Sequence, residues 1–225
     1  LKSIPHYSFA NYAIASPVPT MWWRSVYAST NGFAAESFID ELAHAANKDP
    51  MDFRRSHLRT EGCQVLIDRL EELSAWKTRK INDGWGIAVT ECFGSTVGQV
   101  VKVSRAINNK IKIDKVIAVI DCGWYVNPGI IEAQVEGSIV MALGAATKHA
   151  THFQSGMAVE SNFYNYNMPR INDIPPIEVH IMENNEPAGG VGEPGLPAFA
   201  PALCNAIFDL TGKRIRKLPF NLNEI

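Results

Sequence analysis

The sequence lacks clustered cysteines. The four that it has are Cys63, Cys92, Cys122 and Cys204. They stand 29, 30 and 82 positions apart, and no C-x-x-C pair occurs. Because structural zinc sites and iron–sulfur clusters are usually held by closely spaced thiolates, we expect neither in this chain and interpret the cysteines as buried thiols. The six histidines show no metal-ligand spacing either, since the pair His149 and His152 has no evident third ligand.

The sequence also lacks an excess of charge of either sign. Its formal net charge is −2, which gives no electrostatic reason to expect a nucleic acid or an anionic membrane as partner. We find no apolar run of transmembrane length, and residues 1–20 lack the charged-then-apolar layout of a signal peptide. The compartment stays open between cytoplasm and periplasm. Because the chain begins at Leu1, we interpret it as a piece of a longer polypeptide.

The first eighty residues read as an extended segment followed by helices. Three prolines within residues 1–20 favour extended chain or an edge strand. Apolar residues at helical spacing predict a helix from Asn31 to about Asn47, with Thr30 or Asn31 as N-cap. Further helices are predicted from Asp49–Pro50 onward, with Asp49 as N-cap, and over residues 65–76.

The rest of the chain alternates strands and helices. Strands are predicted over 86–89, 97–103, 111–113, 116–120, 157–163 and 177–182, with a hairpin turn at Asn108–Asn109. A helix rich in small residues is predicted over 129–148, after Asn127–Pro128, and a last helix over 198–210 ends at Gly212. We predict an α+β fold, with packed helices on an antiparallel or mixed sheet. It forms one unit over residues 1–225 or two lobes, 1–80 and 81–225.

The loop at residues 189–195, Gly-Gly-Val-Gly-Glu-Pro-Gly, surrounds Glu193 with four glycines. Glycine leaves room for a ligand and tolerates unusual dihedrals, so Glu193 is a candidate general base. The alternative is a structural loop with a solvated glutamate. The segment also fits G-x-G-x-x-G, but no second parallel strand or later acidic residue follows. Pro194 also removes an amide that would face phosphate. A dinucleotide-binding loop is therefore disfavoured.

Two other segments carry candidate binding residues. Arg24 and Ser25 precede a predicted helix, where an arginine and a helix N-terminus could hold an anionic ligand; the alternative is an arginine packed among Trp22 and Trp23. Gln134 lies among small residues of a predicted helix, where its side-chain amide could bond a ligand in two directions. Segments of this kind more often have a structural role than a role in ligand binding.

In order and spacing, these segments resemble the C-terminal part of the large subunit of molybdenum hydroxylases, the xanthine dehydrogenase and aldehyde oxidase superfamily. The isoquinoline oxidoreductase beta-subunit branch is the most similar. The motifs that carry the resemblance are residues 19–26 (PTMWWRSV), 38–43 (FIDELA), 49–54 (DPMDFR), 121–123 (DCG), 127–128 (NP), 133–137 (AQVEG), 161–163 (SNF), 190–195 (GVGEPG), 200–208 (APALCNAIF) and 211–219 (TGKRIRKLP).

The resemblance implies roles for five residues. Glu193 would be the general base beside molybdenum, Gln134 would bond the pterin, and Arg24 and Ser25 would lie in a loop near the metal. Gly192 would let the base loop approach the cofactor. The implied cofactor is molybdopterin with molybdenum, in its cytosine dinucleotide form. The implied reaction is hydroxylation of an N-heterocycle or oxidation of an aldehyde.

The chain also departs from the family pattern. Tyr27 stands where the family usually has glycine, which could narrow the substrate pocket or displace the loop. The G-G-F-G and G-Q-G loops of the preceding half are absent. The implied partners are therefore the N-terminal half of the large subunit and a small iron–sulfur subunit, and we expect no catalysis from this chain alone. The alternative is a non-catalytic remnant or interaction module that keeps the fold.

Overall fold

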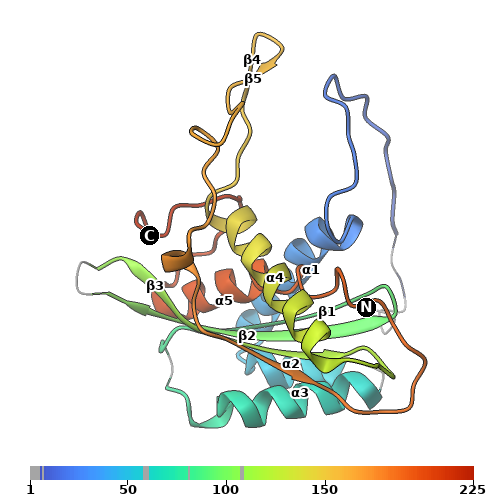
Figure 1. The fold of residues 1–225 in the computed structure, drawn as a ribbon. Helices are drawn as coiled ribbons and strands as arrows, with labels where there is room; N and C mark the ends of the chain where they lie inside the picture. The colour runs from blue at the N-terminus through green and yellow to red at the C-terminus, as the bar shows by residue number, and fades with distance from the viewer. Residues whose placement is uncertain (1–5, 7, 58–60, 81, 107–108) are drawn as a thin grey trace.

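A four-stranded mixed sheet forms the centre of the molecule (Figure 1). The structure is a computed structural model, and it describes residues 6, 8–57, 61–80, 82–106 and 109–225. Strands β1 (Trp85–Cys92), β2 (Ser95–Arg105) and β3 (Ile111–Asp121) form an antiparallel meander. Strand β6 (Ile177–Ile181) joins β3 in parallel, so the sheet is mixed rather than wholly antiparallel.

Helices cover both faces of this sheet. On one face lie α4 (Pro128–Thr147) and α5 (Phe199–Thr211), while α1 (Tyr27–Ala45) packs against α5 and the edge strand β1. On the other face lies α3 (Glu61–Ser74), with α2 (Pro50–His57) and the 3-10 turn η1 (Trp76–Thr78) beside it. The predicted α+β class is confirmed.

Burial on both faces explains why β3 is apolar at consecutive positions. Ala118 and Ile120 belong to the core beneath α4 and α5, whereas Ile117 and Val119 face the core beneath α3. Strands buried on both sides read as continuous apolar runs instead of alternating ones. The sheet is thus a rigid partition between two apolar cores, and its ends can position loops precisely.

Local capping chemistry fixes several helix ends as predicted. Asp49 Oδ1 accepts hydrogen bonds from the amides of Met51 and Asp52 at the start of α2. Asn127 Oδ1 accepts one from Ile130 at the start of α4. Gly212 ends α5 with a φ of 72°, which favours glycine. Asn109 has a φ of 63° in the predicted hairpin turn, whereas Asn108 lies outside the described residues.

Other predicted boundaries are wrong. Helix α1 begins at Tyr27, earlier than the predicted Asn31, and its N-cap position, Val26, makes no side-chain cap. Of the two alternatives for residues 1–20, the edge strand does not form within the described residues 6 and 8–20, whereas irregular chain without helix agrees with the other alternative, an extended segment. Instead of a strand over 157–163, the structure has two short strands, β4 (Phe153–Gln154) and β5 (Met157–Ala158), followed by the 3-10 turn η2 (Ile171–Asp173).

Helix α4 also corrects the sequence-based expectation about membrane-length segments. Within the described part of the chain it is the one helix long and apolar enough to cross a membrane by length and composition. Buried helices of folded domains pass the same test, and 44% of its apolar window is buried inside the molecule. Because α4 packs against β6 and α5, we describe it as a core helix.

A buried ion pair joins α1, α2 and β1. Arg54 of α2 is 2% exposed, and its Nε lies 2.8 Å from Glu36 Oε2 of α1. The same Oε2 accepts the amide of Val89 in β1 at 2.9 Å. Arg54 also donates to the Glu36 carbonyl at 2.9 Å. Removing Arg54 would leave the buried Glu36 carboxylate without its cation.

We therefore predict that Arg54→Ala lowers the free energy of unfolding by about 3–5 kcal/mol, the usual cost of stranding a buried charge. Arg55→Ala is the matched control, because Arg55 pairs with Asp52, Asp68 and Glu71 at the surface. Its loss should cost about 1 kcal/mol or less. Urea denaturation of the 225-residue chain measures both values, and equal losses would contradict the prediction.

Candidate functional site

The glycine loop at residues 189–195 connects β6 to α5 and is held at the end of the sheet by its backbone. The amide of Gly189 donates to the Cys122 carbonyl at 2.8 Å, and that of Gly190 to the Phe93 carbonyl at 2.7 Å. Ser95 Oγ donates to the Gly190 carbonyl at 2.6 Å. The loop is therefore anchored to the β1–β2 hairpin and to the segment after β3.

The four glycines serve two different purposes. A Cβ at Gly189 would lie 2.3 Å from the Gly94 carbonyl oxygen, and one at Gly195 would lie 3.2 Å from the Cα of Val135. A Cβ at Gly192 would meet no atom within 4 Å. None of the four has a positive φ. The sequence-based argument from unusual dihedrals is thus wrong, and the open space lies at Gly192 alone.

Arg24 bridges the glycine loop and helix α4. Its Nε donates to the Gly192 carbonyl at 2.7 Å. Its Nη2 donates to the backbone carbonyl of Gln134 at 3.0 Å and to Gln134 Oε1 at 2.9 Å, and also to the Gly192 carbonyl. Arg24 therefore binds the loop and Gln134, which differs from the alternative of an arginine packed among tryptophans.

Ser25 holds Glu193 by two hydrogen bonds. The Ser25 amide donates to Glu193 Oε1 at 2.8 Å, and Ser25 Oγ donates to the Glu193 carbonyl at 2.7 Å. Ser25 is fully buried, with a φ of 73°, and Val26 follows with a φ of 46°. Non-glycine residues rarely adopt these dihedrals, and strain of this kind concentrates at functional sites. The turn aims the Ser25 amide at the carboxylate.

All five residues singled out from the sequence therefore meet in one cluster. They are Arg24, Ser25, Gln134, Gly192 and Glu193. Among the described residues, no donor contacts Glu193 Oε2, and the side-chain NH2 of Gln134 donates to none. The cluster thus presents a carboxylate oxygen and an amide donor beside the open space at Gly192.

Electrostatics inside the cluster favour a charged arginine next to a neutral thiol. Burial lowers the pKa of Arg24, and the nearby Glu193 carboxylate opposes that change. Because a guanidinium is not deprotonated in proteins, Arg24 keeps its charge. Burial raises the pKa of Cys92 to about 11, with a further contribution from Glu193 and Glu91. Cys92 is therefore a neutral, buried neighbour of the loop.

Sequence reasoning missed a supporting residue, Gln99 of β2. It is fully buried, and its Nε2 donates to the Gly195 carbonyl at 2.6 Å. A signal was present, because Gln99 interrupts an apolar strand between Val97 and Val101 at an inward-facing position. A buried polar side chain in such a position needs a hydrogen-bond partner, and here the partner is the loop.

Tyr27 lies next to the cluster, at the first residue of α1. Its ring is 6.4 Å from that of Phe93, centroid to centroid, and both side chains are partly exposed. Phe93 is the residue whose carbonyl holds the Gly190 amide. The Ser25–Glu193 hydrogen bonds are made with tyrosine at position 27.

The side chains of the other candidate segments make no hydrogen bond to the five residues of this cluster. Asp121 caps a turn, since its Oδ1 accepts from the amide of Gly123 and from Asn184 Nδ2. His149 stacks on Tyr166, and His152 pairs with Glu160. Within the described residues, no group of three His, Cys, Asp or Glu side chains could hold a metal ion. All four cysteines are buried, as predicted.

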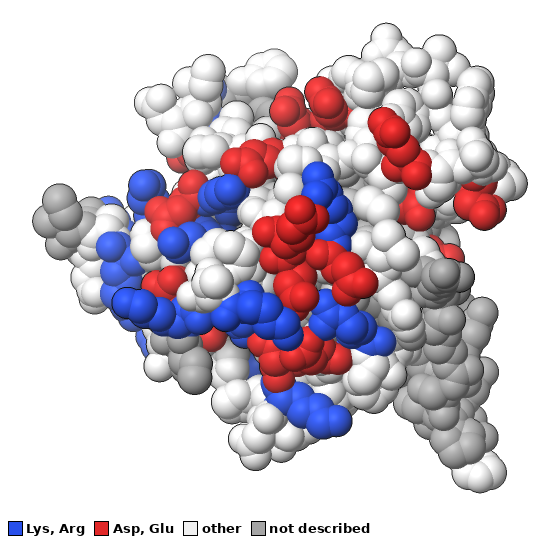
Figure 2. All heavy atoms as spheres, turned by 90° about the horizontal axis from the view of Figure 1, so that it is seen from below, with Lys and Arg blue, Asp and Glu red and all other residues white. Residues whose placement is uncertain are grey.

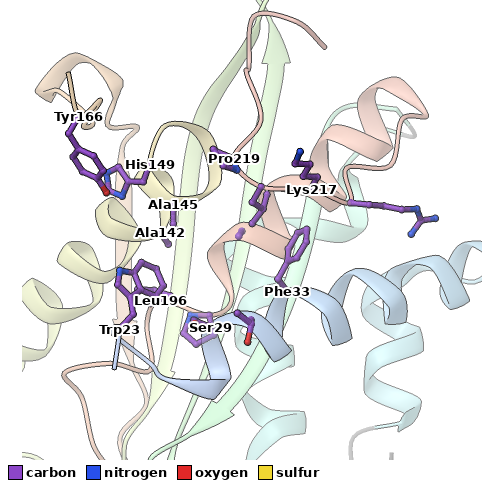
Figure 3. Close-up of a pocket in the computed structure, with 15 residues that line it drawn as sticks. Trp23, Ser29, Phe33, Ala142, Ala145, His149, Tyr166, Leu196, Lys217 and Pro219 are labelled. Carbon is purple, nitrogen blue, oxygen red and sulfur yellow. The ribbon is translucent and has the colours of Figure 1, made fainter. Parts of the chain in front are cut away.

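A cavity of about 610 Å³ opens beside the loop (Figure 3). Ala142, Ala145 and Leu196 contribute apolar surface, and Trp23 lies at one edge. Trp23 directly precedes Arg24, and Leu196 follows Glu193 by three positions. Two chain segments therefore contribute to both the cavity and the cluster.

Comparisons with known proteins identify the family of the chain. The profile of a family described as "Molybdopterin cofactor-binding domain" matches residues 34–175. The chain is 33% identical to the beta subunit of isoquinoline 1-oxidoreductase from Brevundimonas diminuta, over 90% of this chain and 27% of that protein. It is 29% identical to a nicotinate dehydrogenase subunit of Pseudomonas putida, over 99% of this chain and 21% of that protein. The chain thus spans about a quarter of the length of these relatives.

A solved structure gives the same fold. The aldehyde oxidoreductase of Desulfovibrio gigas superposes with a TM-score of 0.74, covering 89% of this chain and 41% of that one. The sequence identity in this superposition is 14%, so the likeness concerns the fold alone.

The two kinds of loop glycine give a direct test by substitution. We predict that Gly195→Ala lowers the free energy of unfolding by about 1–3 kcal/mol, because the new methyl would press on α4. Gly192→Ala should change it by about 0.5 kcal/mol or less, since no atom is displaced. Urea denaturation of both variants checks this pair. A large loss of unfolding free energy in Gly192→Ala would show that the space at Gly192 is filled and would contradict the prediction.

Proposed function

Since the chain belongs to the molybdopterin cofactor-binding domain family, we propose that it forms part of the large subunit of a molybdenum hydroxylase, with Glu193 as its general base. The proposal rests above all on the meeting of five residues, in which Ser25 and Arg24 hold the Glu193 loop against Gln134. The substrate classes are N-heterocycles, by analogy with isoquinoline 1-oxidoreductase and nicotinate dehydrogenase, and aldehydes, by analogy with a relative from Gluconacetobacter polyoxogenes that is named as an aldehyde dehydrogenase.

The residues around Gly192 fit a large polar cofactor. The open space at the Gly192 Cα leaves room for its approach to the backbone. Gln134 would donate through its side-chain NH2, while its Oε1 is held by Arg24. Arg24 keeps a positive charge near an anionic group such as a phosphate. We assign Gln134, Arg24, Ser25 and Gly192 to the binding of molybdopterin, in its cytosine dinucleotide form.

Glu193 would handle the proton of the reaction. When bound, the molybdenum centre supplies the two-electron oxidation of a substrate carbon, with water as the source of the new oxygen. The Ser25 amide fixes Oε1 and so orients the carboxylate. Oε2 is left to accept a proton from the attacking oxygen, as a positioned general base does. The Ser25 Oγ bond to the Glu193 carbonyl holds the backbone in place during that transfer.

Further parts of the enzyme must come from outside this chain. The electrons need an acceptor, which we assign to iron–sulfur clusters on a separate small subunit. The site is half-exposed here, with Glu193 partly buried and Gln134 exposed. Because a general base works in a closed, water-poor site, we propose that the N-terminal half of the large subunit completes it, and that this chain alone is inactive.

The first experiment addresses the base. In the full large subunit with its iron–sulfur partner, Glu193→Gln should lower kcat about 10²- to 10⁴-fold, the usual contribution of a general base. Glutamine Oε1 can still accept from the Ser25 amide, so molybdenum and pterin content should stay unchanged. Steady-state kinetics and metal analysis measure the two quantities. Wild-type turnover by the variant would remove Glu193 from the mechanism.

The second experiment addresses the cofactor-binding residues. Gly192→Ala places a methyl in the open space, so we expect a lower pterin and molybdenum content in the purified full large subunit. Gly94→Ala is unsuitable as a control, because Gly94 has a positive φ that alanine rarely adopts. The control is therefore Ala46→Gly, at the exposed end of α1. Equal cofactor content in wild type and Gly192→Ala would argue against a cofactor at this position.

The alternative function is an interaction module that keeps the fold without catalysis. It is distinguished by the metal content of the full-length protein produced in a cofactor-competent host. Bound molybdenum and pterin would support the enzyme. Their absence from a well-folded protein would leave the module as the function.

A further inference from the structure

Gln99 is a buried carboxamide whose hydrogen bonding is directed to the glycine loop. Its side chain is fully buried on β2, and its Nε2 donates to the Gly195 carbonyl at 2.6 Å. Its Oε1 accepts no hydrogen bond from the described residues. A buried polar atom without a partner costs free energy, which offsets the gain at the Gly195 carbonyl. Stability alone therefore does not explain a glutamine at this position.

The surroundings of Gln99 are apolar. Its cross-strand partners are Ala88 and Ala118, which belong to the core beneath α4 and α5. Charged side chains gather on the other side of the sheet, on the face formed by α2 and α3 (Figure 2). In surroundings of low polarity a hydrogen bond is electrostatically stronger than in water. The bond from Gln99 is thus a firm attachment for the loop.

Gly195 is enclosed between Gln99 and helix α4. A Cβ at Gly195 would lie 3.0 Å from the Cβ of Ser138 and 3.2 Å from the Cα of Val135. Gly195 and Ser138 are both buried. Ser138 follows Gln134 by four positions, so the two residues lie on the same face of α4, about one turn apart. The loop therefore rests on the same part of the helix that carries Gln134.

A tight turn carries this placement to Glu193. The Leu196 amide donates to the Glu193 carbonyl at 3.1 Å, which closes a turn over residues 193–196. Pro194 occupies the second position of the turn, where the fixed φ of proline is favoured. Ser25 Oγ donates to the same Glu193 carbonyl at 2.7 Å. The backbone of Glu193 is thus fixed directly by Ser25 and, through this turn, by Gln99.

We propose that Gln99 is a positioning residue for the reaction: through Gly195 it sets the place of the Glu193 carboxylate. That place is defined relative to Gln134, since Gly195 rests on the adjacent turn of α4. A neutral carboxamide suits this role, because a charged donor would also change the proton affinity of Glu193. The inference rests on the proposed function, in which Glu193 is the base, and adds a residue that acts on it from inside the sheet.

The variant Gln99→Met removes the donor and keeps the length of the side chain. In the full large subunit with its iron–sulfur partner, kcat should fall about 10- to 100-fold, as it does when a catalytic group is misplaced. KM and the molybdenum and pterin content should stay unchanged, because Gln99 acts only through the loop. Backbone amides of residues 189–196 should exchange with deuterium several-fold faster. Wild-type kcat or wild-type exchange in this variant would overturn the proposal.

The variant Val101→Ala is the matched control for a change inside the same core. Val101 is fully buried, two positions after Gln99 on the same face of β2. The smaller side chain leaves a cavity, so the variant should unfold at a lower urea concentration. Its kcat and the exchange of residues 189–196 should stay at the wild-type level. An equal fall in kcat in Val101→Ala and Gln99→Met would assign Gln99 a merely structural role.

The variant Gln99→Glu tests the hydrogen-bond donor by pH. The introduced carboxyl has nearly the shape of the amide, but it can donate to the Gly195 carbonyl only when protonated. Burial and the Glu193 carboxylate both favour the protonated form, so the introduced group has a pKa above that of an ordinary glutamate. Its kcat should exceed that of Gln99→Met at low pH, and this advantage should disappear as the pH rises. Parallel pH profiles of the two variants would overturn the proposal.

The variant Glu193→Gln, measured alongside, separates this proposal from the function on which it rests. Low turnover in Glu193→Gln with wild-type values in Gln99→Met would leave the base in place and remove Gln99 as its positioning residue. Wild-type turnover in Glu193→Gln would overturn both, because no base would then be left to position.

Discussion

The hydrogen bonds between Ser25 and Glu193 are the constraint on which the rest of the site depends. They join residues 168 positions apart and fix both the carboxylate and the carbonyl of the same glutamate. The turn that makes them possible places Ser25 and Val26 in the left-handed region, and helix α1 starts immediately afterwards. Arg24, held in the same turn, reaches Gly192 and Gln134. One strained turn therefore aligns a carboxylate, a cation and an amide.

The sheet makes this alignment rigid. Both faces of the sheet are buried. The glycine loop is hydrogen-bonded to the β1–β2 hairpin, to the segment after β3 and to Gln99 in β2. A site held by such backbone contacts costs little reorganisation when a ligand binds, which is the condition for effective acid–base catalysis. The glycines contribute differently from one another: three allow close packing of the loop on its supports, and Gly192 leaves the open approach.

Charged side chains are unevenly distributed over the surface. The helices α2 and α3 carry interleaved acidic and basic side chains. Residues 8–23 and 150–169 carry exposed apolar side chains and almost no charge. Sequence patterns predicted helix ends better than the irregular segments between them. Asp49, Asn127 and Gly212 mark helix ends by local hydrogen bonding, and these boundaries could be predicted. Residues 150–169 show no regular alternation of apolar and polar side chains, and the strand expected over 157–163 does not form.

The sequence by itself determined the α+β class, three helix caps and which five residues to consider as a candidate site, because each depends on a short motif or on residue chemistry. It also contained evidence for a supporting residue that the sequence analysis missed, because Gln99 is a polar residue within an apolar strand. Only the tertiary structure decided how these pieces meet. The early start of α1, the parallel pairing of β6 and the bond from Ser25 to Glu193 arise from contacts between residues distant in the chain. Such contacts leave no local periodicity, since their energy depends on where the backbone has already been placed.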